Sequence, residues 1–166
     1  MILMNDFKSE PEIMREVMVA ASRRVFESGW YVLGSEVDTF EKKWASICGV
    51  QNGIGVANGM DAIEISLRAL NIGPGDEVIL PSMTFISCAN AITYVGAKPV
   101  FADVEMGSWG LDPIKVKSLI TSKTKAIMAV HLYGFPADMQ ALRTICDENN
   151  LFLIEDSAEA PFAEVS

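Results

Sequence analysis

The chain has 166 residues, enough for one domain with a hydrophobic core, and half of them are apolar, which argues against an intrinsically disordered protein. The 13 Lys and Arg residues against 22 Asp and Glu residues give a net charge of -9, which argues against a nucleic-acid partner because phosphate binding needs clustered positive charge. The N-terminus lacks the features of a signal peptide and no apolar run could span a membrane, so we expect a soluble, cytoplasmic protein.

Two helices are predicted near the N-terminus. Apolar residues recur with helical spacing over residues 12–26, and Gly29 is expected to end this amphipathic helix. Ser35 is predicted to cap a second helix, with Asp38 as the acidic residue of a capping box. Gly49 is the expected stop of the second helix.

Short aliphatic or β-branched runs then alternate with amphipathic stretches. The predicted strands span residues 53–57, 77–80, 99–103, 125–131 and 151–155, and the helices between them span about 60–70, 86–94, 113–120 and 139–149. This alternation predicts an α/β fold of three layers, with a mainly parallel sheet and helices on both faces. We divide the chain into a leading helical segment at 1–34, an α/β core at 35–160 and a divergent tail at 161–166.

The three cysteines do not indicate a disulfide framework or a structural zinc site. Cys48, Cys88 and Cys146 are odd in number, widely spaced and free of any CxxC pair. We therefore expect reduced, buried thiols and no metal site.

The turn Asn58-Gly59-Met60-Asp61 joins a predicted strand to a predicted helix, and Gly59 would let the backbone turn tightly. Free N–H groups of Gly59, Met60 and Asp61 at the helix start would favour a phosphate. An ordinary strand-to-helix turn without a ligand is the alternative. A dinucleotide-binding fingerprint is disfavoured, because the nearby glycines lie in and before the strand rather than after it.

The apolar run at residues 151–154 predicts a buried strand that delivers Glu155 and Asp156 to its carboxyl end. Open α/β sheets bind their ligands at that end of their strands. An aspartate there could pair with a pyridinium nitrogen and keep it protonated, which lets pyridoxal phosphate accept electrons from a substrate carbanion. The alternatives are that Asp156 caps a following turn or pairs with a structural arginine.

Nine segments carry a resemblance to a known family. In chain order they read GWYVLG from residue 29, DTFE from 38, NGMDA from 58, GDEVILPS from 75, TF from 84, GAKPVF from 96, TKAI from 124, VHLYG from 130 and EDSAE from 155. This series, within about residues 26–160, resembles the DegT/DnrJ/EryC1/StrS family of nucleotide-sugar aminotransferases, fold type I enzymes that use pyridoxal phosphate. The pattern is most similar to the members that install a 3-amino group on dTDP-3-keto-6-deoxyhexoses.

The resemblance implies a set of cofactor-binding residues. Gly59 and Met60 would donate backbone N–H groups to the cofactor phosphate, although many relatives have a hydroxyl residue where Met60 stands. Phe85 would stack on the cofactor ring, with a core phenylalanine at a helix start as the alternative. Asp156 would pair with the pyridinium nitrogen, and Glu159 would lie near the phenolic oxygen.

The resemblance ends before the family's Schiff-base lysine, because residues 161–166 replace the expected continuation after Ala160. Lys123 and Lys125 precede their strand and are expected at the opposite end of the sheet from Asp156, so we assign no catalytic residue. His131 is expected to be mainly structural.

The missing lysine leaves two classes of function open. We expect a truncated aminotransferase, inactive alone, with weak or absent pyridoxal phosphate binding, a nucleotide-sugar ligand and a homodimer, or a second polypeptide that supplies the missing half. The alternative is a non-catalytic α/β domain that dimerises or binds a phosphate-bearing ligand. The sequence encoded immediately downstream would discriminate between them.

Overall fold

The computed structural model describes residues 6–164, so the first five residues of the predicted leading segment and the last two of the predicted tail lie outside it. The chain divides into two units between Gly55 and Val56. The predicted boundary at residue 35 coincides with the start of a helix inside the first unit.

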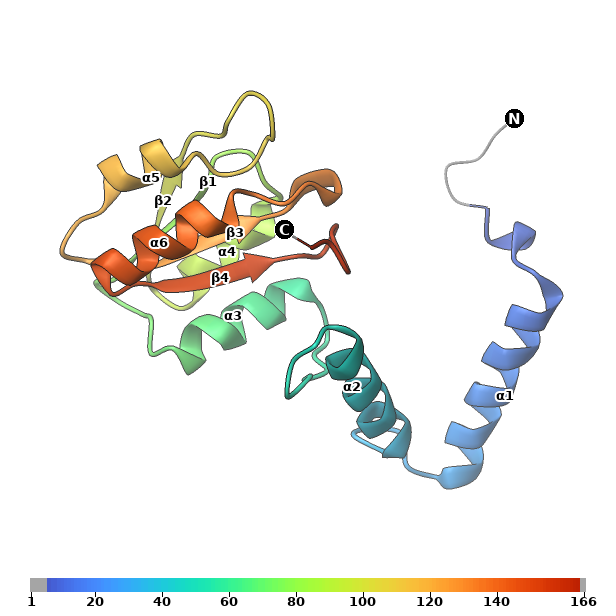
Figure 1. Cartoon of the computed structure of the whole chain (residues 1–166). Helices are drawn as coiled ribbons and strands as arrows, with labels where there is room; N and C mark the ends of the chain where they lie inside the picture. Colours follow the sequence, from blue (N-terminus) through green and yellow to red (C-terminus); the bar gives the residue numbers. More distant parts are fainter. Residues whose placement is uncertain (1–5, 165–166) are drawn as a thin grey trace. The chain divides into compact units, whose positions relative to one another are not determined.

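The first unit contains a short 3-10 helix, Phe7–Ser9, followed by α1, Glu12–Ser28, and α2, Ser35–Ile47 (Figure 1). Both predicted helices are confirmed. Gly29 ends α1 in the left-handed conformation at φ 65°, which glycine adopts without steric cost. The predicted cap of α2 is wrong: Gly34 is the N-cap and no side chain caps the helix, because Ser35 is already its first helical residue.

The second unit contains a parallel sheet with the order β2-β1-β3-β4. Its strands are β1, Glu77–Pro81, β2, Lys98–Ala102, β3, Thr124–Val130, and β4, Phe152–Asp156. Four of the five predicted strands are confirmed. In parallel strands the carboxyl ends lie at one edge, and the register accordingly pairs Val130 with Asp156.

Helices cover both faces of this sheet (Figure 1). They are α3, Gly59–Ala69, α4, Ile86–Tyr94, α5, Pro113–Leu119, and α6, Met139–Asn149. Alternate strand residues point to opposite faces, so Leu80 joins a core with α3 and α4, whereas its neighbour Ile79 joins a core with α5 and α6. The predicted three-layer α/β architecture is confirmed.

The strand predicted at residues 53–57 is wrong, because this segment has no regular secondary structure. No strand in the described part of the chain pairs with it, and a β-branched run without a hydrogen-bonding neighbour does not form a strand. Ile54 is accordingly 81% exposed. Gly55 instead donates its N–H to Glu41 Oε1 at 2.6 Å.

The prediction of a buried last strand is wrong in part. β4 is an edge strand of the described sheet, so one of its sides lacks a neighbour and Phe152 is 47% exposed. The prediction of buried thiols holds for Cys88 and Cys146 but is wrong for Cys48, which is exposed; all three are free.

Within residues 6–164, no helix is long and apolar enough to cross a membrane. The same residues contain no group of three or more His, Cys, Asp or Glu side chains placed to hold a metal ion.

Candidate functional site

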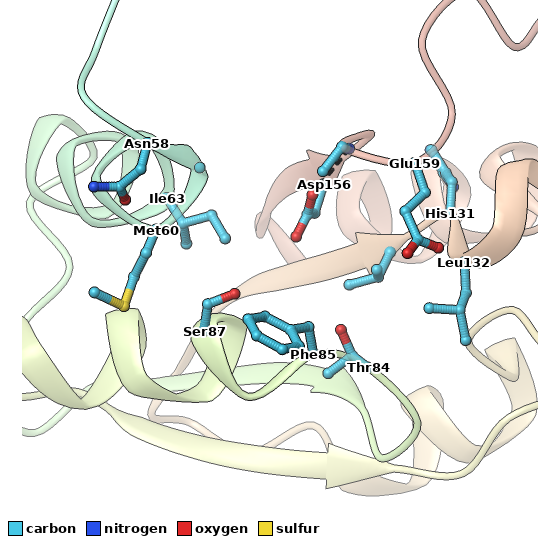
Figure 2. A pocket seen from close by; sticks show the side chains of 13 residues that line it. Asn58, Met60, Ile63, Thr84, Phe85, Ser87, His131, Leu132, Asp156 and Glu159 are labelled. Atoms are coloured by element: carbon cyan, nitrogen blue, oxygen red, sulfur yellow. Dashed lines mark hydrogen bonds between the residues drawn. The ribbon is translucent and has the colours of Figure 1, made fainter. Parts of the chain in front are cut away.

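A cavity of about 370 Å³ lies at the carboxyl edge of the sheet in the second unit (Figure 2). This volume falls in the range of small-molecule sites. The five residues predicted to bind a cofactor all line it: Gly59, Met60, Phe85, Asp156 and Glu159. Its other lining residues are Asn58, Ile63, Thr84, Ser87, Val130, His131, Leu132 and Ala158.

The start of α3 forms one side of the cavity. Asn58 is the N-cap, and its Oδ1 accepts the N–H of Asp61 at 2.9 Å while its Nδ2 donates to Asp61 Oδ2 at 3.1 Å. The prediction that the Asp61 N–H is free is therefore wrong. Within the described residues, the N–H groups of Gly59 and Met60 have no acceptor, and with the helix dipole they form a place for an anion.

The role of Gly59 at the anion-binding start of α3 differs from the role that we predicted. It is the first residue of α3 and does not adopt the left-handed conformation, so no tight turn requires a glycine. A Cβ built on Gly59 would meet no protein atom within 4 Å. Because Gly59 lines the cavity, its missing side chain leaves room for a ligand to approach the backbone.

Asp156 ends β4 and is held by several contacts. Its carbonyl oxygen accepts the His131 N–H at 3.1 Å, Oδ1 accepts the Ala158 N–H at 3.1 Å, and Oδ2 accepts the Cys88 thiol at 3.2 Å. The turn-capping alternative is thus borne out by Ala158, but no arginine pairs with Asp156 in the described residues. Each carboxylate oxygen retains a lone pair that could accept a ligand N–H.

Phe85 is the residue before α4 and forms the floor of the cavity in the view of Figure 2. It is 73% exposed, so the alternative of a core phenylalanine is wrong. A large apolar ring left this exposed at a cavity is available as a stacking surface for a planar ligand.

Glu159 reaches the cavity from the segment after β4. Its Oε2 accepts the N–H of Tyr133 at 2.7 Å, which fixes the carboxylate. Tyr133 adopts a left-handed backbone at φ 56°, a conformation that non-glycine residues adopt at some cost.

His131 lines the cavity but both of its ring nitrogens are occupied. Nδ1 accepts the Ala137 N–H at 3.2 Å, so the ring proton lies on Nε2 and is donated to Glu155 Oε2 at 3.2 Å. This hydrogen bond holds the pKa of Glu155 below its usual value. The contacts agree with a structural role for His131.

Sequence reasoning missed Ser87, Ile63 and Cys88. Ile63 follows Gly59 by one helical turn, and Ser87 lies in the first turn of α4, so helical spacing from the predicted residues was the signal that could have found them. The contact between Cys88 and Asp156 joins positions 68 residues apart and left no local signal.

No lysine in the described part of the chain lines the cavity. Lys125 lies at the amino end of β3, in the strand whose other end pairs with Asp156, and Lys123 immediately precedes that strand. Their predicted place at the opposite edge of the sheet is confirmed.

The sequence of the chain is similar to those of known sugar aminotransferases. The sequence profile of the DegT/DnrJ/EryC1/StrS aminotransferase family matches residues 12–166. The chain is 52% identical over 140 residues to the dTDP-3-amino-3,6-dideoxy-alpha-D-galactopyranose transaminase of Aneurinibacillus thermoaerophilus, covering 84% of this chain and 39% of that protein. It is 45% identical over 155 residues to the dTDP-3-amino-3,4,6-trideoxy-alpha-D-glucose transaminase of Streptomyces venezuelae, covering 93% of this chain and 41% of that protein.

The structural comparison includes the crystal structure of S. venezuelae DesV in complex with a ketimine intermediate. The TM-score is 0.91 at 45% sequence identity, covering 94% of this chain and 42% of that one. The chain thus spans about two fifths of the length of the relatives it matches.

Proposed function

The chain belongs to the DegT/DnrJ/EryC1/StrS aminotransferase family, and from this premise we propose that it forms the pyridoxal-phosphate-binding part of a nucleotide-sugar aminotransferase. The family reaction would transfer an amino group from glutamate to a dTDP-keto-6-deoxysugar, since two similar proteins are named as dTDP-sugar transaminases. One observation carries the proposal: a single cavity brings together an anion-binding helix start, an exposed aromatic ring and a fixed aspartate.

These residues fit the parts of pyridoxal phosphate. The N–H groups of Gly59 and Met60 would hold the phosphate at the start of α3, where the missing Gly59 side chain leaves space. Phe85 would offer its face to the pyridine ring. Glu159 would lie beside the phenolic oxygen, with its carboxylate held by Tyr133.

Asp156 would accept a hydrogen bond from the ring nitrogen of the cofactor and keep that nitrogen protonated. Its two oxygens are oriented by Ala158 and Cys88, and each keeps a lone pair for this contact. The bound cofactor supplies an electron sink for a substrate carbanion, which depends on that protonated nitrogen.

We further propose that a polypeptide of these residues is inactive alone, because no described lysine reaches the cavity. The lysine would come from further sequence or a second polypeptide, and the active assembly would be a homodimer that takes a nucleotide sugar. A dimeric mass in light scattering at micromolar concentration supports the homodimer, and a stable monomer contradicts it. A second candidate is a non-catalytic domain that binds a phosphate-bearing ligand at the start of α3, where the N–H groups of Gly59 and Met60 face the cavity.

Equilibrium dialysis with pyridoxal phosphate tests the proposed function. We expect saturable, reversible binding with a millimolar to high micromolar Kd, equivalent to roughly 4–6 kcal/mol, because only hydrogen bonds, stacking and one charge pair hold the ligand. Phe85→Ala should weaken binding about 2- to 10-fold through the lost stacking surface.

Phe152→Ala is the matched control for this substitution, because Phe152 is also partly exposed but does not line the cavity. Its Kd should equal that of the unmodified chain. Binding that does not saturate, or an equal loss in both variants, contradicts the proposed site.

A further inference from the structure

A buried cysteine lies directly behind the aspartate of the site. Cys88 is on α4, is fully buried, and does not itself line the cavity. Its Sγ lies 3.2 Å from Asp156 Oδ2 and 3.2 Å from Thr84 Oγ1. Burial raises the pKa of the Cys88 thiol to about 11, so the thiol keeps its proton at neutral pH.

The contacts define the direction of these hydrogen bonds. The single thiol proton is donated to Asp156 Oδ2, so the sulfur can only accept from the hydroxyl of Thr84. The result is a directed chain from Thr84 through Cys88 to the carboxylate. Hydrogen bonds in such a chain polarise and strengthen one another.

The two oxygens of Asp156 are therefore held by different elements. Oδ1 is held by the Ala158 N–H in the turn after β4, whereas Oδ2 is held by the thiol on α4. The carboxylate cannot rotate about its terminal bond without breaking one of these contacts. Because Phe85 precedes α4, the same helix start orients both the aromatic surface and the aspartate.

We propose that Cys88 is a positioning residue that orients Asp156 toward the ring nitrogen of the bound cofactor. This inference rests on the proposed function and adds a residue to it. Fixing a charged group with supporting hydrogen bonds preorganises a site and raises its selectivity for the ligand atom that the group contacts.

The test compares two ligands that differ at one atom. One is pyridoxal phosphate and the other is its 1-deaza analogue, in which carbon replaces the ring nitrogen. The ratio of their Kd values isolates the contact with Asp156, because the phosphate and the ring face are common to both. Asp156→Asn removes the charge pair with the ring nitrogen, so the Kd values of the two ligands should become nearly equal.

Cys88→Ala should lower the preference for pyridoxal phosphate about 3- to 10-fold, the effect of losing one ordinary hydrogen bond, because a thiol is a weak donor. Cys88→Ser, which restores a donor, should retain most of the preference. Cys88→Val also lacks the donor and replaces Cys88→Ala if that variant does not fold.

Cys146→Ala is the matched control. Cys146 is also fully buried and its pKa is also raised to about 11 by burial, but its Sγ faces the carbonyl oxygen of Phe152 at 3.7 Å. It should lose stability as Cys88→Ala does and keep the ligand preference, which separates positioning from packing.

The outcomes distinguish the two proposals. No saturable binding of either ligand by the unmodified chain overturns the proposed function. A preference for pyridoxal phosphate that survives in Cys88→Ala and Cys88→Val overturns the role of Cys88 alone. Equal binding of both ligands by the unmodified chain overturns the contact of Asp156, and with it the positioning role, but leaves cofactor binding in place.

Discussion

Leu67→Ala should lower the free energy of unfolding by about 2–5 kcal/mol, the range for truncating a fully buried leucine. Leu67 has no exposed surface and belongs to the core that α3 and α4 form against one face of the sheet. The loss combines the transfer of the side chain with the cavity left behind, and it is a large part of the stability of a typical small domain. Urea denaturation followed by circular dichroism measures it.

Ile65→Ala is the matched control on the same helix. Ile65 is 50% exposed, so its truncation should change the unfolding free energy by no more than about 1 kcal/mol. Because Leu67 lies two turns from the start of α3, the folded fraction of Leu67→Ala should bind pyridoxal phosphate as the unmodified chain does. Equal effects of the two substitutions would contradict the core assigned to α3.

The order of elements could be predicted because local signals and tertiary structure agree in most of the chain. The runs that became β1 to β4 are short, aliphatic and separated by helical periodicity, so the parallel α/β arrangement followed from spacing alone. Residues 53–57 carry a similar run but form no strand. A strand requires a hydrogen-bonding neighbour, and no local pattern encodes whether one is present.

The candidate site could be predicted in outline for a related reason. The carboxyl ends of parallel strands share one edge, and this reason holds for Asp156 at the end of β4. The turn before α3 was expected at the same edge because a strand was predicted at residues 53–57; the turn does line the cavity, although that strand is absent. The details divide by the distance along the chain. The Asp61 N–H is paired with Asn58 three residues before it, a cap that an asparagine at a helix start could have indicated. The thiol behind Asp156 belongs to a residue 68 positions away, and no local pattern encodes that contact.

A polypeptide of these 166 residues, incubated with pyridoxal phosphate and reduced with borohydride, should carry no single lysine that is modified stoichiometrically. A Schiff base requires an amine at the cofactor aldehyde, and no described lysine lines the cavity. Lys98 is paired with Glu77 at 3.0 Å at the amino ends of β1 and β2, and Lys125 lies at the same edge of the sheet. Asp156 lies at the opposite, carboxyl edge.

Mass spectrometry of the reduced protein measures the labelling, and an assay of amino transfer from glutamate to a dTDP-keto-sugar measures the activity. We expect traces of label spread over exposed lysines, unchanged in Phe85→Ala because those lysines do not depend on the cavity, and no transfer. The covalent anchor and the base for the proton shift are one group in this chemistry, so labelling and activity should be absent together. Stoichiometric labelling of one lysine, sensitive to Phe85→Ala and accompanied by amino transfer, would show that a lysine of this chain reaches the site.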